Sequence, residues 1–333
     1  MFKLRSLFKQ GFLTLLTFIL VFTSTAGMAQ LSFGDWQYTI NGNNAIITRY
    51  TGSSTDVSIP STINGLSVQY MNNSAFAGNT TVTSVIVPSS ITGVLGTNPN
   101  PFDFCMNLVS ITVDPLNWVF SSLDGVFFNK NQTTLLEYPM GKLGSYAIPV
   151  GVTRIASYAF DNCTNLTSVT IPNTVTTIFA YGFVGCSSLT TVTIPASVAT
   201  IGEHGFYDCY ALTNVLFTGG APVAGMFAFG VDWLSPPKII YYLPGTTGWD
   251  STYAGVPTAP WTPTVSTPSV QSDQFGFNIN WASGMSVVVE ASTSLSGGTW
   301  VPLATNSLTS GSFYFSDPQW ANNPSRFYRV RSQ

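Results

Sequence analysis

Residues 159–172 read AFDNCTNLTSVTIP, and nearly the same pattern returns as GFVGCSSLTTVTIP at residues 182–195. A third copy, GFYDCYALTNVLF, begins at residue 205. Phenylalanine, cysteine, leucine and valine each recur at intervals of 23 residues, and an Ile-Pro pair keeps the same spacing. A fixed period of this length is typical of solenoid proteins, in which each repeat forms one coil of a continuous stack.

Each repeat carries its own structural signals. Alternating apolar residues in L-x-x-V-x-I, followed by proline, predict a short strand. The next stretch brings a second inward pair, Val175 and Ile178, and its Thr and Val content disfavours a long helix. One coil buries too few apolar side chains to offset the entropy of ordering its backbone. The coils must therefore stack, and we predict a mainly β solenoid with a parallel sheet.

Looser copies precede these three. They read FDFCMNLVSITV at residues 102–113 and FAGNTTVTSVIVP at residues 76–88, where Asn79 takes the place of the cysteine. Residues 57–76 supply a first coil before them. The repeat therefore extends over most of the chain.

The complete pattern, I-P-x-x-V-x-x-I-x-x-x-x-F-x-x-C-x-x-L-x-x-V, resembles the BspA-like leucine-rich repeat family of secreted and surface bacterial proteins. The resemblance covers residues 33–260. Residues 122–149 are similar to the family's hairpin-like variant coil, and YYLPGTTGW at 241–249 is similar to a segment that closes such arrays. The resemblance implies a curved right-handed leucine-rich repeat solenoid with a parallel sheet on one face. It also implies a role in binding or adhesion, and it carries no catalytic residues to transfer.

The four cysteines occupy one column of the repeat; they are Cys105, Cys163, Cys186 and Cys209. Four cysteines in a secreted chain suggest two disulfides. However, equivalent residues on stacked coils lie ~4.8 Å apart with side chains pointing the same way, whereas bridged cysteines turn toward each other. In leucine-rich repeats this column turns inward and packs against the loop backbone. We predict a ladder of buried thiols, and the alternative is one disulfide between Cys186 and Cys209.

Residues 1–29 have the features of a secretory signal peptide. A basic start is followed by a twelve-residue apolar run at residues 11–22 and by small residues up to Ala29, where we expect cleavage. The run is too short for a spanning helix, although an uncleaved anchor is the alternative. We therefore expect a secreted or cell-surface protein with no membrane span after cleavage.

The rest of the chain divides into two parts. We expect the solenoid with its caps at residues 30–261, a linker rich in Pro, Thr and Ser at 262–270, and a β-sandwich at 271–333. Alternating stretches such as FGFNINW at 275–281 predict the strands of that sandwich. It resembles the immunoglobulin- or fibronectin-like modules of secreted bacterial repeat proteins, and spacing, attachment and sugar binding are all open roles for it.

Charge excludes some partners. Only 8% of the residues are charged, and three of the eleven Lys and Arg residues lie in the signal peptide. The remaining eight face fourteen Asp and Glu residues, so the net charge is near −6. Because no basic cluster occurs before the last residues, nucleic acid is not an expected partner. The sequence indicates no oligomeric state.

No pattern of catalytic residues is found. His204 is the only histidine, and we expect it to be a solvated loop residue; its neighbour Glu203 does not make a triad. Four aspartates fall in predicted turns, where Asp is expected for local hydrogen bonding; they are Asp114, Asp124, Asp161 and Asp208. We expect no enzyme activity, no metal site and no cofactor.

The outward positions of the strands are the candidate binding face. Ser168, Thr191 and Asn214 form one column, and Thr170, Thr193 and Leu216 form its neighbour. The columns are either a neutral solvated surface or a recognition surface for a protein or polysaccharide outside the cell. Three aromatic residues near the end of the array are expected to cap the last coil, with sugar stacking as the alternative; they are Trp233, Trp249 and Tyr253. The predicted function is protein recognition or adhesion, and the alternatives are carbohydrate binding and a passive structural role.

Overall fold

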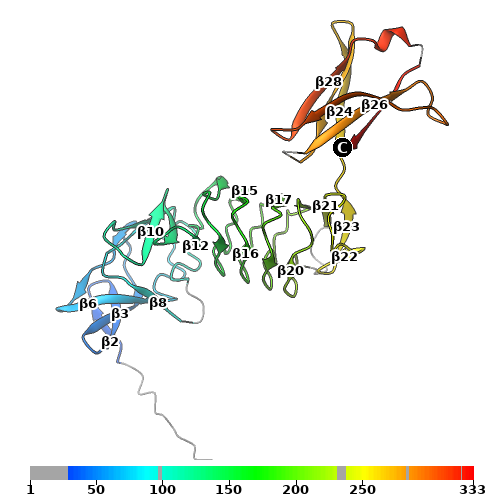
Figure 1. The fold of residues 1–333 in the computed structure, drawn as a ribbon. Helices are drawn as coiled ribbons and strands as arrows, with labels where there is room; N and C mark the ends of the chain where they lie inside the picture. Colours follow the sequence, from blue (N-terminus) through cyan, green and yellow to red (C-terminus); the bar gives the residue numbers. More distant parts are fainter. Residues whose placement is uncertain (1–28, 97–99, 231–237, 283–284, 324) are drawn as a thin grey trace, which may run out of the picture.

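The computed structural model describes residues 29–96, 100–230, 238–282, 285–323 and 325–333. Within these residues the regular elements are β-strands, apart from the short 3-10 helix η1 (Trp320–Asn322). A solenoid is followed by two small antiparallel sheets (Figure 1). The predicted mainly β solenoid with a small β-sandwich after it is therefore confirmed. The predicted signal peptide lies, apart from Ala29, outside the described residues.

Each 23-residue repeat contributes one strand to each of two sheets. We call them the front sheet and the back sheet, and in Figure 1 they run along the upper and lower edges of the regular coils, which are drawn in green. The front sheet, in spatial order, consists of β13 (Gly144–Ala147), β15 (Leu166–Thr170), β17 (Thr191–Ile194), β19 (Asn214–Phe217), β21 (Ile239–Tyr242), β23 (Val256–Pro260) and β22 (Thr252–Tyr253). The back sheet consists of β10 (Phe120–Leu123), β11 (Val126–Asn129), β12 (Thr134–Glu137), β14 (Arg154–Ile155), β16 (Thr177–Ile178), β18 (Thr200–Ile201) and β20 (Val223–Ala224).

Most neighbouring strands in these sheets are parallel, as stacked coils require. The exceptions are the antiparallel pairs β10–β11–β12 and β22–β23, which lie at opposite ends of the two sheets. The hairpin-like variant coil expected within residues 122–149 is thus present as β10, β11 and β12. The short back-sheet strands form the return side of each coil. The second inward pair of the repeat lies there, and Val175 and Ile178 of this pair are fully buried.

The N-terminal coils form a separate unit with its own apolar core. Its mixed sheet consists of β1 (Leu31–Phe33), β2 (Trp36–Asn41), β3 (Asn44–Tyr50), β6 (Leu66–Asn72), β5 (Thr62–Ile63) and β8 (Gly93–Leu95). A parallel sheet consists of β4 (Asp56–Ser58), β7 (Ser84–Val87) and β9 (Ser110–Val113). Phe127 of β11 belongs to this core, whereas Phe128 belongs to the core of the later coils. Successive side chains of a strand point to opposite faces, so β11 separates the two cores.

A column of stacked aromatic rings runs through the later coils. It consists of Tyr138, Phe160, Phe183, Phe206 and Phe229, each at most 1% exposed. The distances between successive ring centroids are 5.1, 4.5, 4.8 and 5.4 Å. The 23-residue period places one ring in each coil, and the strand spacing of ~4.8 Å sets the distance between them. The three inner rings, Phe160, Phe183 and Phe206, are therefore covered on both faces by their neighbours.

The cysteines join each coil to the one before it. The Sγ of Cys186 donates to the carbonyl oxygen of Phe160 at 3.2 Å, and the Sγ of Cys209 donates to that of Phe183 at 3.1 Å. Cys163 and Cys105 make the same contact with Tyr138 and Phe76, at 3.5 and 3.1 Å. All four are buried free thiols, so the predicted thiol ladder is confirmed and the alternative Cys186–Cys209 disulfide is not formed. Burial raises the pKa of Cys105 to about 12.

Asn79 makes different hydrogen bonds from the cysteines of the same column. Its Oδ1 accepts hydrogen bonds from the backbone N–H groups of Thr81 and Val82, both at 2.9 Å. The column therefore holds either a thiol that bonds the preceding coil or an amide that bonds its own loop.

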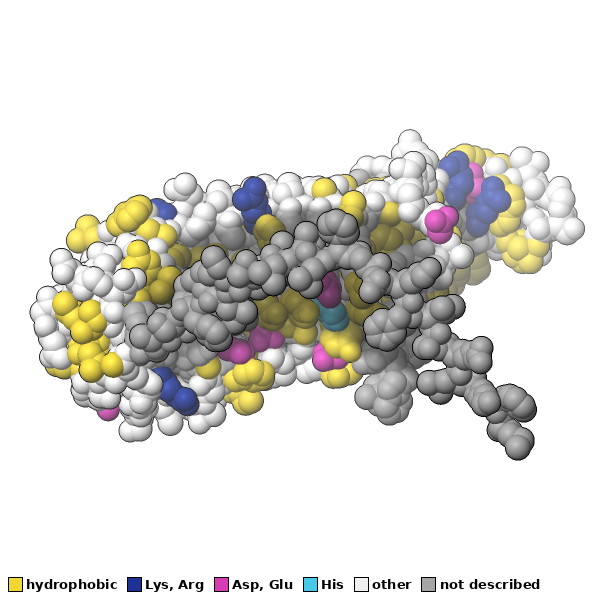
Figure 2. All heavy atoms as spheres, turned by 90° about the horizontal axis from the view of Figure 1, so that it is seen from below, with side chains coloured by type: hydrophobic (Ala, Val, Ile, Leu, Met, Phe, Trp, Pro, Cys, Tyr) yellow, Lys and Arg dark blue, Asp and Glu magenta, His cyan; other side chains and the backbone are white. Residues whose placement is uncertain are grey.

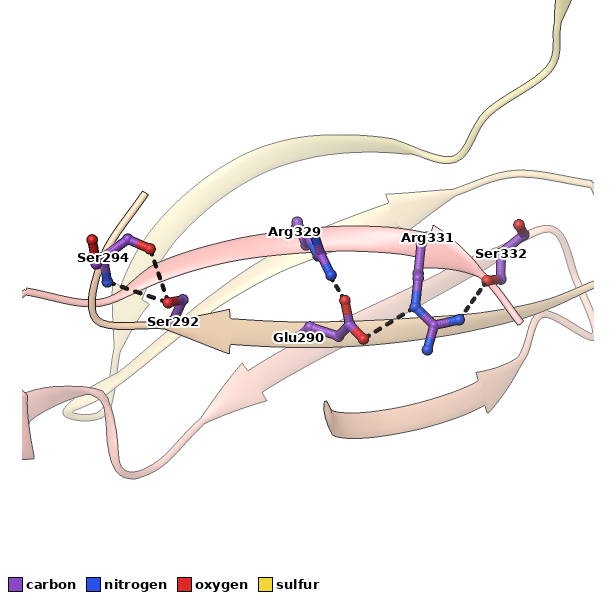
Figure 3. Close-up of polar contacts among 6 residues, drawn as sticks. All are labelled: Glu290, Ser292, Ser294, Arg329, Arg331 and Ser332. Carbon is purple, nitrogen blue, oxygen red and sulfur yellow. Dashed lines mark hydrogen bonds and ion pairs between the residues drawn. The ribbon is translucent and has the colours of Figure 1, made fainter. Parts of the chain in front are cut away.

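The C-terminal part is a pair of three-stranded antiparallel sheets around a shared core. One sheet consists of β24 (Thr264–Gln271), β25 (Gln274–Asn280) and β28 (Ser312–Asp317); the other consists of β27 (Val301–Ser307), β26 (Ser286–Ser292) and β29 (Phe327–Ser332). The core includes Phe277, Ile279 and Val289. On the second sheet the buried Glu290 accepts hydrogen bonds from Arg329 at 2.6 Å and Arg331 at 3.1 Å (Figure 3). These contacts lower the pKa of Glu290.

The segment expected to be a linker, residues 262–270, is mostly strand. β24 pairs with β25 along its length, and the pairing shifts register between Ser266 and Ser269. Thr267 has a φ of +53° there, and Pro268 follows it. Proline is tolerated on an edge strand or at a bulge, and β24 has both properties. The Pro, Thr and Ser composition therefore indicated a bulged edge strand rather than an unpaired connector.

The aromatic column predicts where stability resides. Replacing Phe183 by Ala should lower the free energy of unfolding by about 3–5 kcal/mol, because it empties a fully buried site between two rings. Replacing the exposed Thr193 by Ala should cost less than about 0.5 kcal/mol. Urea unfolding of residues 30–333, followed by circular dichroism, measures both. A tolerated Phe183→Ala together with a destabilising Thr193→Ala would mean that the inside and outside of the coil are exchanged.

The thiol ladder predicts a difference in reactivity between native and unfolded protein. All four thiols should react with a chromogenic disulfide reagent in denaturant, and essentially none should react in the native state, because the sulfurs are buried. Rapid reaction of the native protein, or a count of two thiols in denaturant, would contradict the ladder.

Candidate functional site

The six residues of the predicted binding face lie on β15, β17 and β19. Val169 pairs with Val192, and Val192 pairs with Val215, so the residues beside these buried valines align across the strands. The outward residues make two rows, Ser168–Thr191–Asn214 and Thr170–Thr193–Leu216. All six face away from the core, and each is exposed or partly exposed. Their role in binding stays a prediction.

Both rows continue along the front sheet. Ser145 pairs with Ser168 and Asn214 with Ile239, while Ala147 pairs with Thr170 and Leu216 with Tyr241. Neither row contains an acidic or basic side chain. Within the described residues, the hydroxyl groups of the four Ser and Thr residues on the predicted face have no hydrogen-bond partner; they are Ser168, Thr170, Thr191 and Thr193. These hydroxyls are free to bind a ligand.

Trp261 stands at the C-terminal end of the rows. Its backbone N–H donates to the carbonyl oxygen of Tyr242 at 2.6 Å, which continues the front sheet by one residue. Its carbonyl oxygen accepts a hydrogen bond from Nε1 of the buried Trp281 at 2.9 Å. The half-buried Trp261 ring packs against the core of the C-terminal sheets, which also includes Leu243, the residue that follows β21. Trp261 is thus held from both parts of the chain.

Two clefts flank Trp261 on this face. One has a volume of about 520 Å³ and includes Thr193, Leu216 and Thr218 in its lining. The other has a volume of about 400 Å³ and includes Thr191, Asn214 and Tyr241. Four residues of the predicted face therefore line clefts. The sequence pattern did not single out Trp261. Side chains alternate in direction along a strand, so the residue after Pro260 points outward, as the residues of the two rows do.

The other aromatic residues near the end of the array act as a cap. Trp249 lies 4.8 Å from Phe217 and 5.2 Å from Tyr253, between ring centroids, and both Trp249 and Tyr253 pack against the solenoid core. The hydroxyl of Tyr253 donates to the carbonyl oxygen of Pro222 at 2.8 Å. These contacts favour capping over sugar stacking. Trp233 lies outside the described residues.

The expectation of a solvated His204 is wrong. Its ring is stacked on that of Tyr181 at 4.9 Å and lies 5.5 Å from that of Phe227. Tyr158 continues the stack at 4.8 Å from Tyr181. These four positions are 23 residues apart, so the period that stacks the phenylalanines also stacks a second column. The spacing was available in the sequence. The Nδ1 of His204 lies 3.4 Å from a carboxylate oxygen of Glu203, which is half-exposed.

One of the four aspartates, Asp161, lies in a turn as expected and is also part of a buried acidic cluster. Asp161 is 8% exposed, and Glu137 on β12 is 3% exposed. Burial, followed by a hydrogen bond with Asp103 and its charge, raises the pKa of Asp161 to about 7. Burial, followed by the charges of Asp161 and Asp103, raises the pKa of Glu137 well above its usual range. The cluster lies where the variant coil joins the regular repeats.

Among the described residues, no three His, Cys, Asp or Glu side chains are grouped so that they could hold a metal ion. In that same part of the chain, no helix has the length and apolar character needed to cross a membrane. On the part of the face in Figure 2 that is not drawn in grey, charged side chains are few.

The two-sheet coils and their repeating core define a leucine-rich repeat solenoid. The family model described as the BspA type leucine rich repeat region matches six copies, over residues 49–140 and 137–231. This is more than half of the chain, and the protein therefore belongs to the BspA type leucine-rich repeat family.

Solved structures of bacterial proteins are similar to parts of the chain. A leucine-rich repeat protein from Eubacterium ventriosum shows 28% identity and a TM-score of 0.43, over 50% of this chain and 44% of that one. This chain thus spans less than half of that protein. The leucine-rich repeat protein TpLRR of T. pallidum shows 24% identity and a TM-score of 0.32, over 62% of this chain and 91% of that one. The pneumococcal vaccine antigen PcpA shows 14% identity and a TM-score of 0.37, over 65% of this chain and 94% of that one. No curated protein matches the chain.

The acidic cluster predicts that stability falls as pH rises. Asp161 and Glu137 bind protons more tightly in the folded protein than in the unfolded chain, where carboxyl pKa values are ~4. Their contribution is therefore fully present below about pH 4 and is lost as the pH rises through the raised pKa values, of which that of Asp161 is about 7. Urea unfolding of the wild type and of Glu137→Gln across this range measures it, and the variant should show a smaller fall. An unchanged pH dependence in the variant would mean that Glu137 is ionised in the folded protein.

Proposed function

We propose that this protein is a secreted or cell-surface recognition protein that adheres through the outward face of the front sheet. Membership of the BspA type family supports a bacterial surface protein. The observation that carries the proposal is the pair of aligned outward rows, whose hydroxyls have no partner among the described residues. On this proposal residues 1–29 direct export, the solenoid recognises the partner, and residues 271–333 position it.

The chemistry of the face limits the kind of recognition. Because the rows carry no charged side chain, long-range electrostatic attraction contributes little to the encounter, and binding depends on shape, hydrogen bonds and apolar contact. The strands hold the side chains on a regular two-dimensional lattice, so the partner must present matching groups at regular intervals. An adhesive surface of this kind is broad rather than deep.

A pair of matched variants tests the proposal. Thr193 on β17 and Thr200 on β18 are both exposed threonines of the same coil, one on the front sheet and one on the back sheet. Residues 30–333 are immobilised, partners are captured from surface extracts, and the affinity for the captured partner is measured. Thr193→Glu should weaken binding at least about tenfold, because it introduces an unpaired charge into a neutral interface. Thr200→Glu should change it less than about twofold.

The outcome that contradicts the proposal is equally specific. Equal affinities of the two variants for the partner would move the binding surface away from the front sheet. Failure of the wild type to bind any protein or glycan at micromolar concentration would favour a passive structural role instead.

A further inference from the structure

The two clefts beside Trp261 have the size and lining of ligand sites. Their volumes, about 520 and 400 Å³, fall within the range of clefts that bind small molecules or segments of a polymer. Each combines an aromatic ring with hydroxyl or amide groups. Thr193 and Thr218 supply hydroxyls to the larger cleft, and Thr191 and Asn214 supply polar groups to the smaller one.

No charged side chain lines either cleft. Their polar side chains are Thr, Asn, Tyr and Trp, and Asp, Glu, Lys, Arg and His are absent from both linings among the described residues. A phosphate, sulfate, carboxylate or ammonium group placed there would lose water without gaining an opposite charge. The ligand that suits these linings is therefore uncharged and rich in hydrogen-bonding groups.

Trp261 supplies a flat apolar surface that is already in place. The ring contacts both clefts, and hydrogen bonds of its backbone N–H and carbonyl groups join it to Tyr242 and Trp281. Because the ring also packs against the core of the C-terminal sheets, it loses little conformational entropy when a ligand binds. Sugar rings present one face of C–H groups and an edge of hydroxyls, so an aromatic face beside free hydroxyls complements them.

The outward rows extend this chemistry along the solenoid. Neighbouring strands place equivalent side chains ~4.8 Å apart. This spacing is close to the length of one hexose unit in an extended polysaccharide. A chain of sugars lying across the strands would meet the hydroxyls of Thr193 and Thr170 at successive units and reach Trp261 at its end.

A protein partner suits these clefts less well. Binding energy between proteins is concentrated in large side chains such as Trp, Tyr and Arg near the centre of an interface. Here the rows carry short side chains on β13, β15 and β17, and the large rings, Tyr241 and Trp261, line a concave site at their C-terminal end. The observations therefore favour a polymer with a small repeating unit.

We propose that the front sheet binds an uncharged polysaccharide, whose chain lies along the two outward rows and one of whose rings stacks on Trp261. This inference rests on the proposed function and names the class of its ligand.

Neutral oligosaccharides test the proposal directly. Residues 30–333 are titrated with cellohexaose, laminarihexaose, xylohexaose and mannohexaose, with hexagalacturonate as the charged comparison, by calorimetry and tryptophan fluorescence. At least one neutral hexasaccharide should bind, and hexagalacturonate should not. The affinity should change less than about twofold between low and high salt, because no charged pair is formed.

Matched variants locate the site. Trp261→Ala should weaken binding at least about tenfold, whereas Trp118→Ala, which removes a tryptophan 72% exposed and outside both clefts, should leave it within about twofold. Because Trp261 also packs against the C-terminal core, Thr193→Val provides a second test that removes only a hydroxyl. It should weaken binding several-fold, and Thr200→Val on the back sheet should not.

The possible results separate this inference from the proposed function. If no neutral hexasaccharide binds, or if Trp261→Ala and Thr193→Val both bind like the wild type, the inference is overturned. If in that case a captured protein partner is still lost with Thr193→Glu, the proposed function stands without it. If neither glycan nor protein binds at the front sheet, both are wrong.

Discussion

The structure depends on the contact between one coil and the next. A single coil leaves its inward side chains open on two sides, and only the neighbouring coils cover them. The aromatic column shows this most directly, because the Phe183 ring lies between the rings of Phe160 and Phe206 at 4.5 and 4.8 Å. The thiols follow the same rule, since Cys186 and Cys209 each bond a carbonyl oxygen in the preceding coil. Stability and shape therefore come from repetition.

Repetition also requires backbone conformations that single residues disfavour. Tyr158, Tyr181, His204 and Phe227 occupy one position of the repeat, and their φ angles are +62°, +61°, +55° and +52°. The left-handed region costs roughly 1–2 kcal/mol for a residue with a side chain. Stacking between successive rings, as between Tyr158 and Tyr181 at 4.8 Å, offsets part of that cost. Aromatic side chains thus occupy a turn position where glycine is the usual choice.

A fold of this kind leaves its outward positions free for function. The inward columns are restricted to residues that fit between coils, whereas the outward rows do not contribute to the core. In this protein the rows are uncharged and carry short side chains on β13, β15 and β17. The large rings Tyr241 and Trp261 lie at the C-terminal end, where the chain enters its last two sheets. The solenoid therefore supplies a regular lattice, and its junction with the C-terminal sheets adds concave sites to it.

The sequence by itself determined whatever repeats. The period of 23 residues indicated the coils, the inward Phe and Cys columns and the outward Ser and Thr rows, because each is a local pattern copied at a fixed interval. The tertiary structure decided the contacts between residues that are not part of the 23-residue repeat pattern. Trp261 lies beside Thr193, Asp161 lies near Asp103, and β24 pairs with β25 because remote or non-repeating segments meet there. Contacts of this kind depend on how the chain closes in space. His204 is an intermediate case. Its column follows the 23-residue period, but its partial burial depends on the rings that lie on either side of it.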